Sequence, residues 1–290
     1  MSDASTSAAK PWQEWIGKQV TASDEASAAT MRRFAALLDG PAARADQGVL
    51  PAFGHWLLFL PEEPQSGLGP DGHPKRGGFL PPIDLPNRLW AGSSVVFHRP
   101  IRLGSRVVRR STITSIDSKS GRSGPIAFVS LLHEIMVGDE LAIEERQEVA
   151  YRGPIVASAA GPDVARDSRV PDHVRRHTPD PVQLFRYSAL TFNAHRIHYD
   201  APYARDVEGH PGLVVHGPYI ATLLVDHLLR NHPDLVIARF RCRAMRPAYA
   251  GSPLALNMRR DEHGQWQLWA TGDDGGLHMD AEVQVQPGVS

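Results

Sequence analysis

Residues 188–204 read SALTFNAHRIHYDAPYA and gather polar, titratable side chains between two apolar segments. His195 and His198 are three residues apart, and an imidazole changes charge near neutral pH, so either ring can accept or donate a proton. Asn193 can orient a water molecule through its amide, and Asp200 can cap the short segment that follows. A solvated polar loop would have the same composition. The rest of the sequence must therefore decide between a loop and a catalytic site.

A metal site is one alternative, because His198 and Asp200 have the His-x-carboxylate spacing of a non-haem iron centre. Such a centre needs a third, distant histidine, followed by a basic residue for the co-substrate carboxylate. His263 and His278 are distant histidines, but no Arg or Lys follows either of them before the chain ends. The sequence therefore predicts no metal and no other cofactor.

A nucleophilic hydrolase is a second alternative, in which VVHGP at 214–218 would form an oxyanion loop. The chain contains no Gly-x-Ser-x-Gly nucleophile elbow. Cys242, the only cysteine, lies in a strand predicted at 236–244, on the face where every second residue is small or apolar. A buried, unreactive thiol is the better interpretation of Cys242.

The elements around the polar stretch favour a third arrangement. A strand-like segment at 183–190 precedes the stretch, and an amphipathic helix is predicted at 217–230. The apolar residues with helical spacing are Ile220, Leu223, Leu224 and Leu228. A helix N-terminus offers free backbone N–H groups and the positive end of a dipole. Backbone N–H groups near Gly217 can therefore stabilise a developing oxyanion.

The chain divides into two halves with a similar pattern. Residues 154–180 lack periodicity and have the composition of a linker. On either side, RPIRLGS at 99–105 and RPAYAGS at 246–252 share four residues of seven. Each motif leads into alternating segments typical of antiparallel strands with one buried face. The central helix of the second half has no counterpart in the first, because PDGHPKRGGFLPPID at 70–84 holds too much Pro and Gly.

The bulk composition excludes several classes of protein. The 290 residues are 42% hydrophobic and 22% charged, with a formal net charge of −1. A nearly neutral chain has no bulk attraction to nucleic acid or anionic lipid, and no apolar run is long enough to span a membrane. A single cysteine rules out an intrachain disulfide and is typical of cytoplasmic proteins. A further, smaller helix is predicted at 24–38, with Ser23 as its N-cap.

Two runs carry a family resemblance: YSALTFNAHRIHYDAPYA at 187–204 and PGLVVHGPYIATLLVDHLL at 211–229. Together they resemble the hydratase motif of MaoC-like (hydratase-2) enoyl-CoA hydratases and dehydratases. Within this family the chain is most similar to the branch that includes mesaconyl-CoA and itaconyl-CoA hydratases. The resemblance is specific over 184–230 and more diffuse over GGFLPPIDLPNRLWAGSSVVFHRPIRLGS at 77–105.

The resemblance implies an α+β double hotdog fold with two antiparallel sheets. The central helix is expected in the C-terminal half and a loop in its place in the N-terminal half. The implied domains are an N-terminal hotdog-like domain at 10–153, a linker at 154–180 and a C-terminal catalytic hotdog domain at 181–290. A homodimer or higher homo-oligomer is expected.

The resemblance also assigns roles within the motif. His198 matches the catalytic histidine of the family, whereas the position of the catalytic Asp holds Asn193 and an Asn-Pro pair is replaced by His195 and Arg196. Because an amide does not take up a proton, Asn193 is expected to position water while His198 acts as the general base, with Gly217 at the oxyanion. His195 remains the alternative base.

The implied reaction is the reversible hydration of an α,β-unsaturated acyl-CoA thioester, with a short branched dicarboxylic acyl group such as itaconyl or mesaconyl. The alternatives are a 3-hydroxyacyl-acyl-carrier-protein dehydratase of fatty-acid synthesis and a non-catalytic acyl-thioester binding module. The expected substrate contacts are His195, His216, Arg88 and Trp90. Arg88 would pair with the acyl carboxylate. Arg241 and Arg243, on the polar face of a strand, would bind the CoA phosphates.

Overall fold

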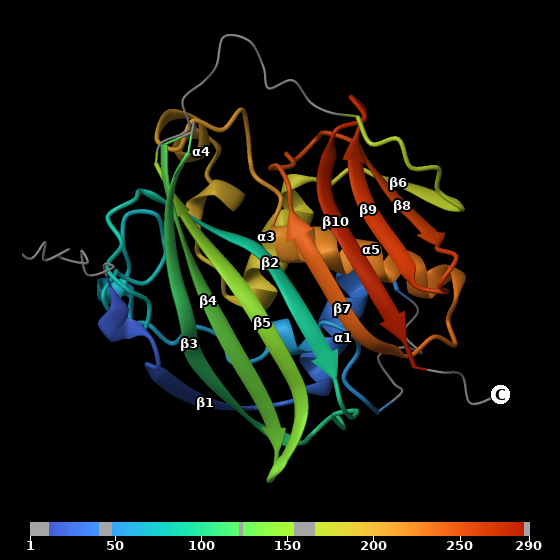
Figure 1. Cartoon of the computed structure of the whole chain (residues 1–290), viewed down its shortest axis with the longest axis horizontal. Coiled ribbons are helices and arrows are strands. Elements are labelled where there is room, and N and C mark those ends of the chain that lie inside the picture. Colours follow the sequence, from blue (N-terminus) through green and yellow to red (C-terminus); the bar gives the residue numbers. More distant parts are fainter. Residues whose placement is uncertain (1–11, 41–47, 122–123, 154–165, 287–290) are drawn as a thin grey trace, which may run out of the picture.

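The computed structural model describes residues 12–40, 48–121, 124–153 and 166–286. Within these residues the main feature is a ten-stranded antiparallel sheet that runs through the molecule (Figure 1). The strands of the N-terminal half are β1 (Gln19–Glu25), β2 (Asn87–Phe97), β3 (Arg106–Gly121), β4 (Gly124–Val137) and β5 (Glu140–Arg152). The strands of the C-terminal half are β6 (His173–His177), β7 (Ile237–Ala244), β8 (Leu254–Arg260), β9 (Trp266–Gly272) and β10 (Leu277–Val285).

The two halves repeat one strand order, as two hotdog domains should. The order is β1-β3-β4-β5-β2 in the N-terminal half and β6-β8-β9-β10-β7 in the C-terminal half. The halves join where β2 pairs with β7, and Ser93 lies opposite Cys242. The two sheets expected from the sequence are therefore joined edge to edge into one continuous sheet. This pairing satisfies the backbone groups of two strands that would otherwise be exposed edges.

The helix predicted at 217–230 is confirmed as α5 (Gly217–Asn231), which lies against the C-terminal half of the sheet (Figure 1). All its residues from Tyr219 to Leu228 are buried, because α5 contacts β8, β9, β10 and also β2. Its buried charge is paired, since Asp226 accepts hydrogen bonds from Arg175 and Arg230. Among the described residues no helix is both long and apolar enough to cross a membrane. Packing on all sides fixes the position of the N-terminus of α5.

The N-terminal half has a loop where the C-terminal half has α5, as predicted. The regular structure of residues 58–86 is a 3-10 turn at Gln65–Gly67 and an isolated β-bridge between Leu68 and Pro74. Loop residues such as Ile83 pack on part of the inner face of the N-terminal strands, and the rest of that face lines a cavity. The absence of a central helix thus leaves space next to residues 188–204, the candidate catalytic stretch of the other half.

The N-terminal helix begins later than predicted. It is α1 (Ala28–Leu37), and Ser27 is its N-cap, with a side chain that accepts the N–H of Thr30. Residues 19–25 instead form β1 and pair with β3, so Ser23 lies within a strand. Backbone pairing with β3 along the sheet edge therefore decides the conformation of this segment.

The segment predicted as strand-like at 183–190 is a helix, α3 (Pro181–Thr191). Asp180 and Gln183 form a reciprocal capping box, and Pro181 occupies the first helical position. Both features start helices, and they decide the conformation of a segment whose apolar pattern is ambiguous. The helix ends at Phe192, which has a left-handed backbone with φ of 47°.

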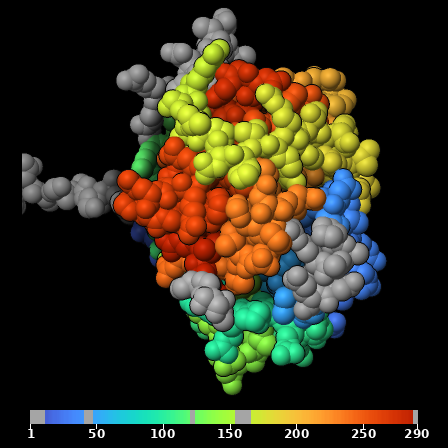
Figure 2. Space-filling view, turned by 90° about the vertical axis from the view of Figure 1, so that its right-hand side faces the viewer, coloured from blue at the N-terminus to red at the C-terminus, as the bar shows by residue number. Residues whose placement is uncertain are grey.

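The predicted linker at 154–180 is too long. Residues 154–165 lie outside the described part, but residues 173–177 form β6 and pair with β8. Figure 2 shows the segment from residue 166, in yellow-green, lying against the orange and red strands of the C-terminal half. The C-terminal half therefore begins before residue 181.

Candidate active site

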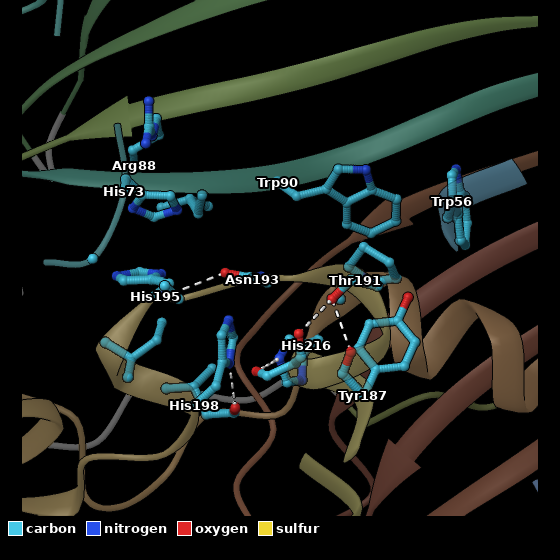
Figure 3. Close-up of a pocket in the computed structure, with 18 of the residues that line it drawn as sticks. Trp56, His73, Arg88, Trp90, Tyr187, Thr191, Asn193, His195, His198 and His216 are labelled. Atoms are coloured by element: carbon cyan, nitrogen blue, oxygen red, sulfur yellow. Dashed lines mark hydrogen bonds between the residues drawn. The ribbon is translucent and has the colours of Figure 1, made fainter. Parts of the chain in front are cut away.

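A cavity of about 1060 Å³ lies between the two halves. In Figure 3 one wall is the inner face of β2, and the opposite wall is formed by the catalytic stretch and the start of α5. The loop that replaces the N-terminal helix closes another side. The cavity is lined by these predicted site residues: His198, Asn193, Gly217, His195, His216, Arg88 and Trp90.

His198 is held as a neutral base. It ends the 3-10 turn η4 (Arg196–His198), and its Nδ1 lies 2.7 Å from the carbonyl oxygen of Val214. Since a carbonyl only accepts hydrogen bonds, Nδ1 carries the proton and Nε2 is left unprotonated. Burial, together with the nearby imidazoles of His216 and His195, holds the pKa of His198 well below its usual value. At neutral pH the ring is therefore ready to accept a proton at Nε2.

His216 supports the ring of His198. The two rings are stacked, with centroids 3.6 Å apart and planes 19° apart. Nε2 of His216 lies 2.8 Å from Oγ of Ser188, and Nδ1 is buried with no hydrogen-bond partner among the described residues. Burial, with a smaller effect of His195, lowers the pKa of His216 to about 3. Two neutral rings can stack without charge repulsion.

Asn193 presents a donor to the cavity. Its Oδ1 accepts the backbone N–H of His195 at 3.0 Å. The oxygen of the amide is therefore engaged, and the NH2 group remains as the hydrogen-bond donor of this side chain. Asn193 can donate a hydrogen bond to a water or substrate oxygen, but it cannot remove a proton.

The loop before β2 contacts the catalytic stretch from the N-terminal half. The carbonyl oxygen of Asp71 accepts the N–H of Arg196 at 2.9 Å. The next residue, Gly72, has φ of +89°, and a Cβ there would lie 1.8 Å from the carbonyl oxygen of Ala194. Only glycine allows both this backbone conformation and so close an approach. Gly72 therefore sets how closely the N-terminal loop packs on the residues between Asn193 and His198.

Gly72→Ala is expected to lower kcat by about 100-fold, because a displacement of about 1 Å in the catalytic stretch is enough for such a loss. The strained backbone should also lower the free energy of unfolding by about 1 to 3 kcal/mol. Gly78→Ala in the same loop is the control, since a Cβ there meets nothing within 4 Å and its φ is ordinary. Steady-state kinetics and thermal unfolding measure both effects. Equal kcat values for the two variants would show that the loop contact does not position the site.

Two histidine–carboxylate pairs meet beside Asn193. Nε2 of His195 lies 2.9 Å from Oε1 of Glu208, and Nδ1 of His73 lies 3.0 Å from Oδ2 of Asp71. The two rings are in contact, with centroids 4.1 Å apart. Burial lowers the pKa of His73 to about 4, against the opposing effect of Asp71. Burial alone would raise the pKa of Asp71, but the hydrogen bond with His73 holds it below its usual value.

A metal ion is not assigned to this cluster. Asp71, His73 and His195 each have one potential ligand atom within 4.8 Å of the others. The hydrogen bonds described above already engage these side chains. The positive charge of Arg88 acts directly on His73 and would repel a cation placed there. The cluster therefore consists of two hydrogen-bonded pairs.

The first residue of α5 lies under an indole. A Cβ on Gly217 would come within 2.6 Å of Cε3 of Trp90. The ring of Trp56 stands edge-on to Trp90, with centroids 6.2 Å apart. These aromatic rings shield the N-terminus of α5 from water on this side, and electrostatic stabilisation is stronger where water is excluded. Only a residue without a side chain allows this packing.

Next to Trp56 the inner face of the N-terminal half is polar, a feature that the sequence pattern did not predict. Glu145 is buried and accepts hydrogen bonds from Trp56 at 3.1 Å, from Ser93 at 2.6 Å and from His55 at 3.2 Å. Burial would raise the pKa of Glu145, but these bonds, the one from His55 foremost, lower it to about 2. An ionised carboxylate thus lines the cavity opposite Val95, seven residues along β2 from Arg88.

The structure does not bring Arg241 and Arg243 to the cavity. Both are exposed on β7, where they alternate with the buried Phe240 and Cys242, so they lie on the outer face of the sheet. Arg246, just after this strand, lines the cavity instead. Burial raises the pKa of the Cys242 thiol, in keeping with an unreactive cysteine.

Asp200, within the catalytic stretch, is confirmed as a cap. Its side chain accepts the N–H of Tyr203 at the start of α4 (Ala201–Asp206).

Three cavity residues were not predicted from the sequence: His73, Glu208 and Trp56. His73 lies in the Gly- and Pro-rich loop expected to replace a helix, which was a signal for it. Neither Glu208 nor Trp56 belongs to a motif, and only the fold brings them to the cavity.

Two hotdog halves in one sheet, with a buried histidine and a helix N-terminus facing a shared cavity, define a MaoC-like hydro-lyase. Solved structures support the fold. HtdX of Mycobacterium tuberculosis superimposes with a TM-score of 0.66 at 18% identity, over 92% of this chain and 100% of that one. Another M. tuberculosis protein, described as a double hotdog fold, gives a TM-score of 0.54 at 14% identity, over 93% and 96% of the two chains.

The chain belongs to the family Hydroxyacyl-thioester dehydratase type 2, whose profile matches residues 53–250. It is 44% identical to the mesaconyl-C(4)-CoA hydratase of Chloroflexus aurantiacus, over 94% of this chain and 98% of that protein. It is 30% identical to the mitochondrial hydroxyacyl-thioester dehydratase type 2 of Schizosaccharomyces pombe, over 70% of this chain and 75% of that protein.

Proposed function

We propose that this protein catalyses the reversible hydration of an α,β-unsaturated acyl-CoA thioester to the 3-hydroxyacyl-CoA. The observation that supports this most directly is the neutral His198, whose unprotonated Nε2 faces the cavity beside the N-terminus of α5. A base for water and the positive end of a helix dipole for the thioester oxygen thus occupy one enclosed space. The similarity to a CoA-thioester hydratase favours CoA as the carrier.

In the hydration direction, a water molecule lies between Asn193 and His198. Its oxygen accepts a hydrogen bond from the Asn193 amide and it donates one to Nε2 of His198. His198 removes a proton as the water oxygen bonds to the β-carbon, and the electrons of the double bond move towards the thioester oxygen. The N–H of Gly217 stabilises the resulting enolate, with about 3 to 4 kcal/mol for each donor of this kind. Protonation of the α-carbon completes the 3-hydroxyacyl thioester.

The acyl group in this proposal is short, branched and dicarboxylic, of the mesaconyl or itaconyl type. Arg88 is two residues from Trp90 on β2, about 7 Å along the strand from the indole that covers Gly217. A carboxylate at the end of a short acyl chain can reach that distance, and the planar fork of Arg is well suited to bind it. The ionised Glu145 gives the cavity a polar wall beside Trp56, which suits a short polar acyl group better than a long apolar one.

Arg88→Met is expected to lower kcat/KM for the dicarboxylic substrate by roughly 10- to 100-fold, as follows from the loss of a charged hydrogen bond. The loss on neutral crotonyl-CoA should be no more than a few-fold. Arg110→Met is the control, because Arg110 is an exposed arginine on β3 that pairs with Glu134. Equal losses on both substrates for Arg88→Met would contradict the assignment of Arg88 to the carboxylate.

The function itself is tested with a panel of enoyl thioesters, by following the ultraviolet absorbance lost as the conjugated double bond is hydrated. The panel contains crotonyl-CoA, mesaconyl-CoA, itaconyl-CoA, a long neutral enoyl-CoA and crotonyl-acyl carrier protein. We expect the highest kcat/KM for a dicarboxylic CoA thioester. Preference for the carrier-protein thioester would indicate a dehydratase of fatty-acid synthesis, and binding without turnover would indicate a binding module.

A further inference from the structure

His195 and His198 occupy different electrostatic environments within one cavity. Both rings are buried, and their centroids are 5.5 Å apart in a near-perpendicular arrangement. His198 bonds to a neutral carbonyl, whereas His195 bonds to the carboxylate of Glu208 at 2.9 Å. The side chains of His195 and Glu208 are 6% and 9% exposed, so water hardly screens this pair. A carboxylate in such contact stabilises a protonated imidazole as an ion pair, and a carbonyl does so much less.

We propose that His195, held by Glu208, is the second proton-transfer residue of the reaction and delivers the proton to the α-carbon. This inference rests on the proposed function and explains how the chain works without the carboxylate of its family motif. Asn193 stands where that carboxylate would be, and its amide cannot carry a proton. Glu208 is then a positioning residue that acts through His195.

Each of the two histidines transfers one proton in the reaction. In the hydration direction, His198 begins neutral and His195 begins as an imidazolium paired with Glu208. His198 takes a proton from water as the C–O bond forms at the β-carbon, and His195 gives a proton to the α-carbon as the enolate collapses. The reaction ends with His198 protonated and His195 neutral, and exchange with water restores the starting state. Dehydration uses the same two residues in the opposite roles.

The distance between the rings suits this division of labour. The carbons that react are adjacent in the substrate, so the two groups that serve them must lie side by side. The rings of His195 and His198 are such neighbours, in edge-to-face contact with centroids 5.5 Å apart. Both His195 and His198 line the cavity, and so does Glu208.

Several charged or titratable groups from other elements surround His195. His73 contacts its ring but stays neutral, because burial lowers the pKa of His73 to about 4. The carboxylate of Asp71 lies near the imidazole of His195, and the positive charge of Arg88 acts on His73. The other titratable groups near the pair are His198, Tyr203, His210, His216 and Arg152. Of all these groups, Glu208 is the one in direct hydrogen-bond contact with the imidazole of His195.

The test is the pH dependence of kcat/KM for hydration of the best substrate of the panel. Activity requires neutral His198 and protonated His195, so a bell-shaped profile is expected, with an alkaline limb that belongs to His195. Glu208→Gln removes the charge without changing the shape, and should move the alkaline limb towards lower pH by about one unit or more. Glu208→Asp should restore much of the wild-type profile. Asp206→Asn removes an exposed carboxylate two residues away and should leave both limbs in place.

His195→Asn provides the second variant, because it installs the residue that the family motif has at this position. The alkaline limb should disappear, with kcat reduced by about 100-fold or more. Unchanged limbs in both Glu208→Gln and His195→Asn would overturn the proposal and leave a structural role for the pair. Failure of the proposed function would give a different result, because the wild type itself would then hydrate no thioester of the panel.

Discussion

Replacement of His198 by alanine is expected to lower kcat by about 100- to 10,000-fold, the usual contribution of a general acid or base. The imidazole carries the unprotonated Nε2 that accepts the proton of water in the proposed mechanism, and alanine offers no substitute. The variant should still bind an enoyl thioester, because the walls of the cavity and the helix N-terminus are unchanged. Stopped-flow or steady-state absorbance measurements on the folded variant give kcat directly.

Stability must be measured alongside the activity of this variant. His198 donates a hydrogen bond to the carbonyl oxygen of Val214, and its loss leaves a buried acceptor unpaired at a cost of about 1 to 3 kcal/mol. Thermal unfolding and circular dichroism should therefore show a less stable but folded protein. A well-folded variant with activity within a few-fold of wild type would transfer the role of base to His195.

The pH dependence of the wild type follows from the same environment. Burial holds the pKa of His198 well below its usual value, so its unprotonated form persists at a pH where a free imidazole would already be protonated. Activity should therefore be maintained through neutral pH, and the acidic limb of the profile, where His198 becomes protonated, should lie below the ordinary range of histidine. An acidic limb centred near the ordinary histidine value would contradict the assignment of His198 as the buried base.

Gly217→Ala is the second change with a large expected effect, a loss of kcat of about 100- to 1000-fold. The new Cβ would come within 2.6 Å of Trp90, so either the indole or the start of α5 must move. Either displacement moves the N–H donors away from the thioester oxygen, and loss of one such donor has this magnitude. Because the enolate is affected more than the ground state, kcat should fall more than KM rises.

Gly212→Ala is the matched control, since Gly212 lies five residues before Gly217 and a Cβ there meets nothing within 4 Å. This variant should retain wild-type kinetics and stability. If Gly217→Ala behaved like Gly212→Ala, the N-terminus of α5 would have no role in stabilising the enolate. A large drop in both substrate binding and stability, without a selective effect on kcat, would point to the indole packing alone.

The sequence by itself determined the features that rest on local patterns. Helical spacing of apolar residues located α5, the Pro- and Gly-rich composition of 70–84 excluded a second central helix, and alternation located the strands. The polar, titratable residue types of 188–204 are rarely found so close together, and this pattern indicated His198 as a catalytic candidate. Where local signals conflicted, the interpretation failed: the capping box of Asp180 and Gln183 made a helix of the segment interpreted as a strand, and pairing with β3 placed Ser23 in β1.

Only the tertiary structure decided which distant residues share the cavity. Trp90 lies on Gly217 because β2 pairs with β7 and carries the N-terminal half over the start of α5. Glu208 meets His195 because α4 packs on η4 within the C-terminal half. Arg241 and Arg243 alternate correctly with buried neighbours, yet alternation cannot tell which face of a sheet meets the cavity. That face is set by packing against α5, which covers the side of Phe240 and leaves the arginines on the other. Local periodicity fixes an element and its buried side, whereas contacts between residues far apart in sequence arise only when the halves join.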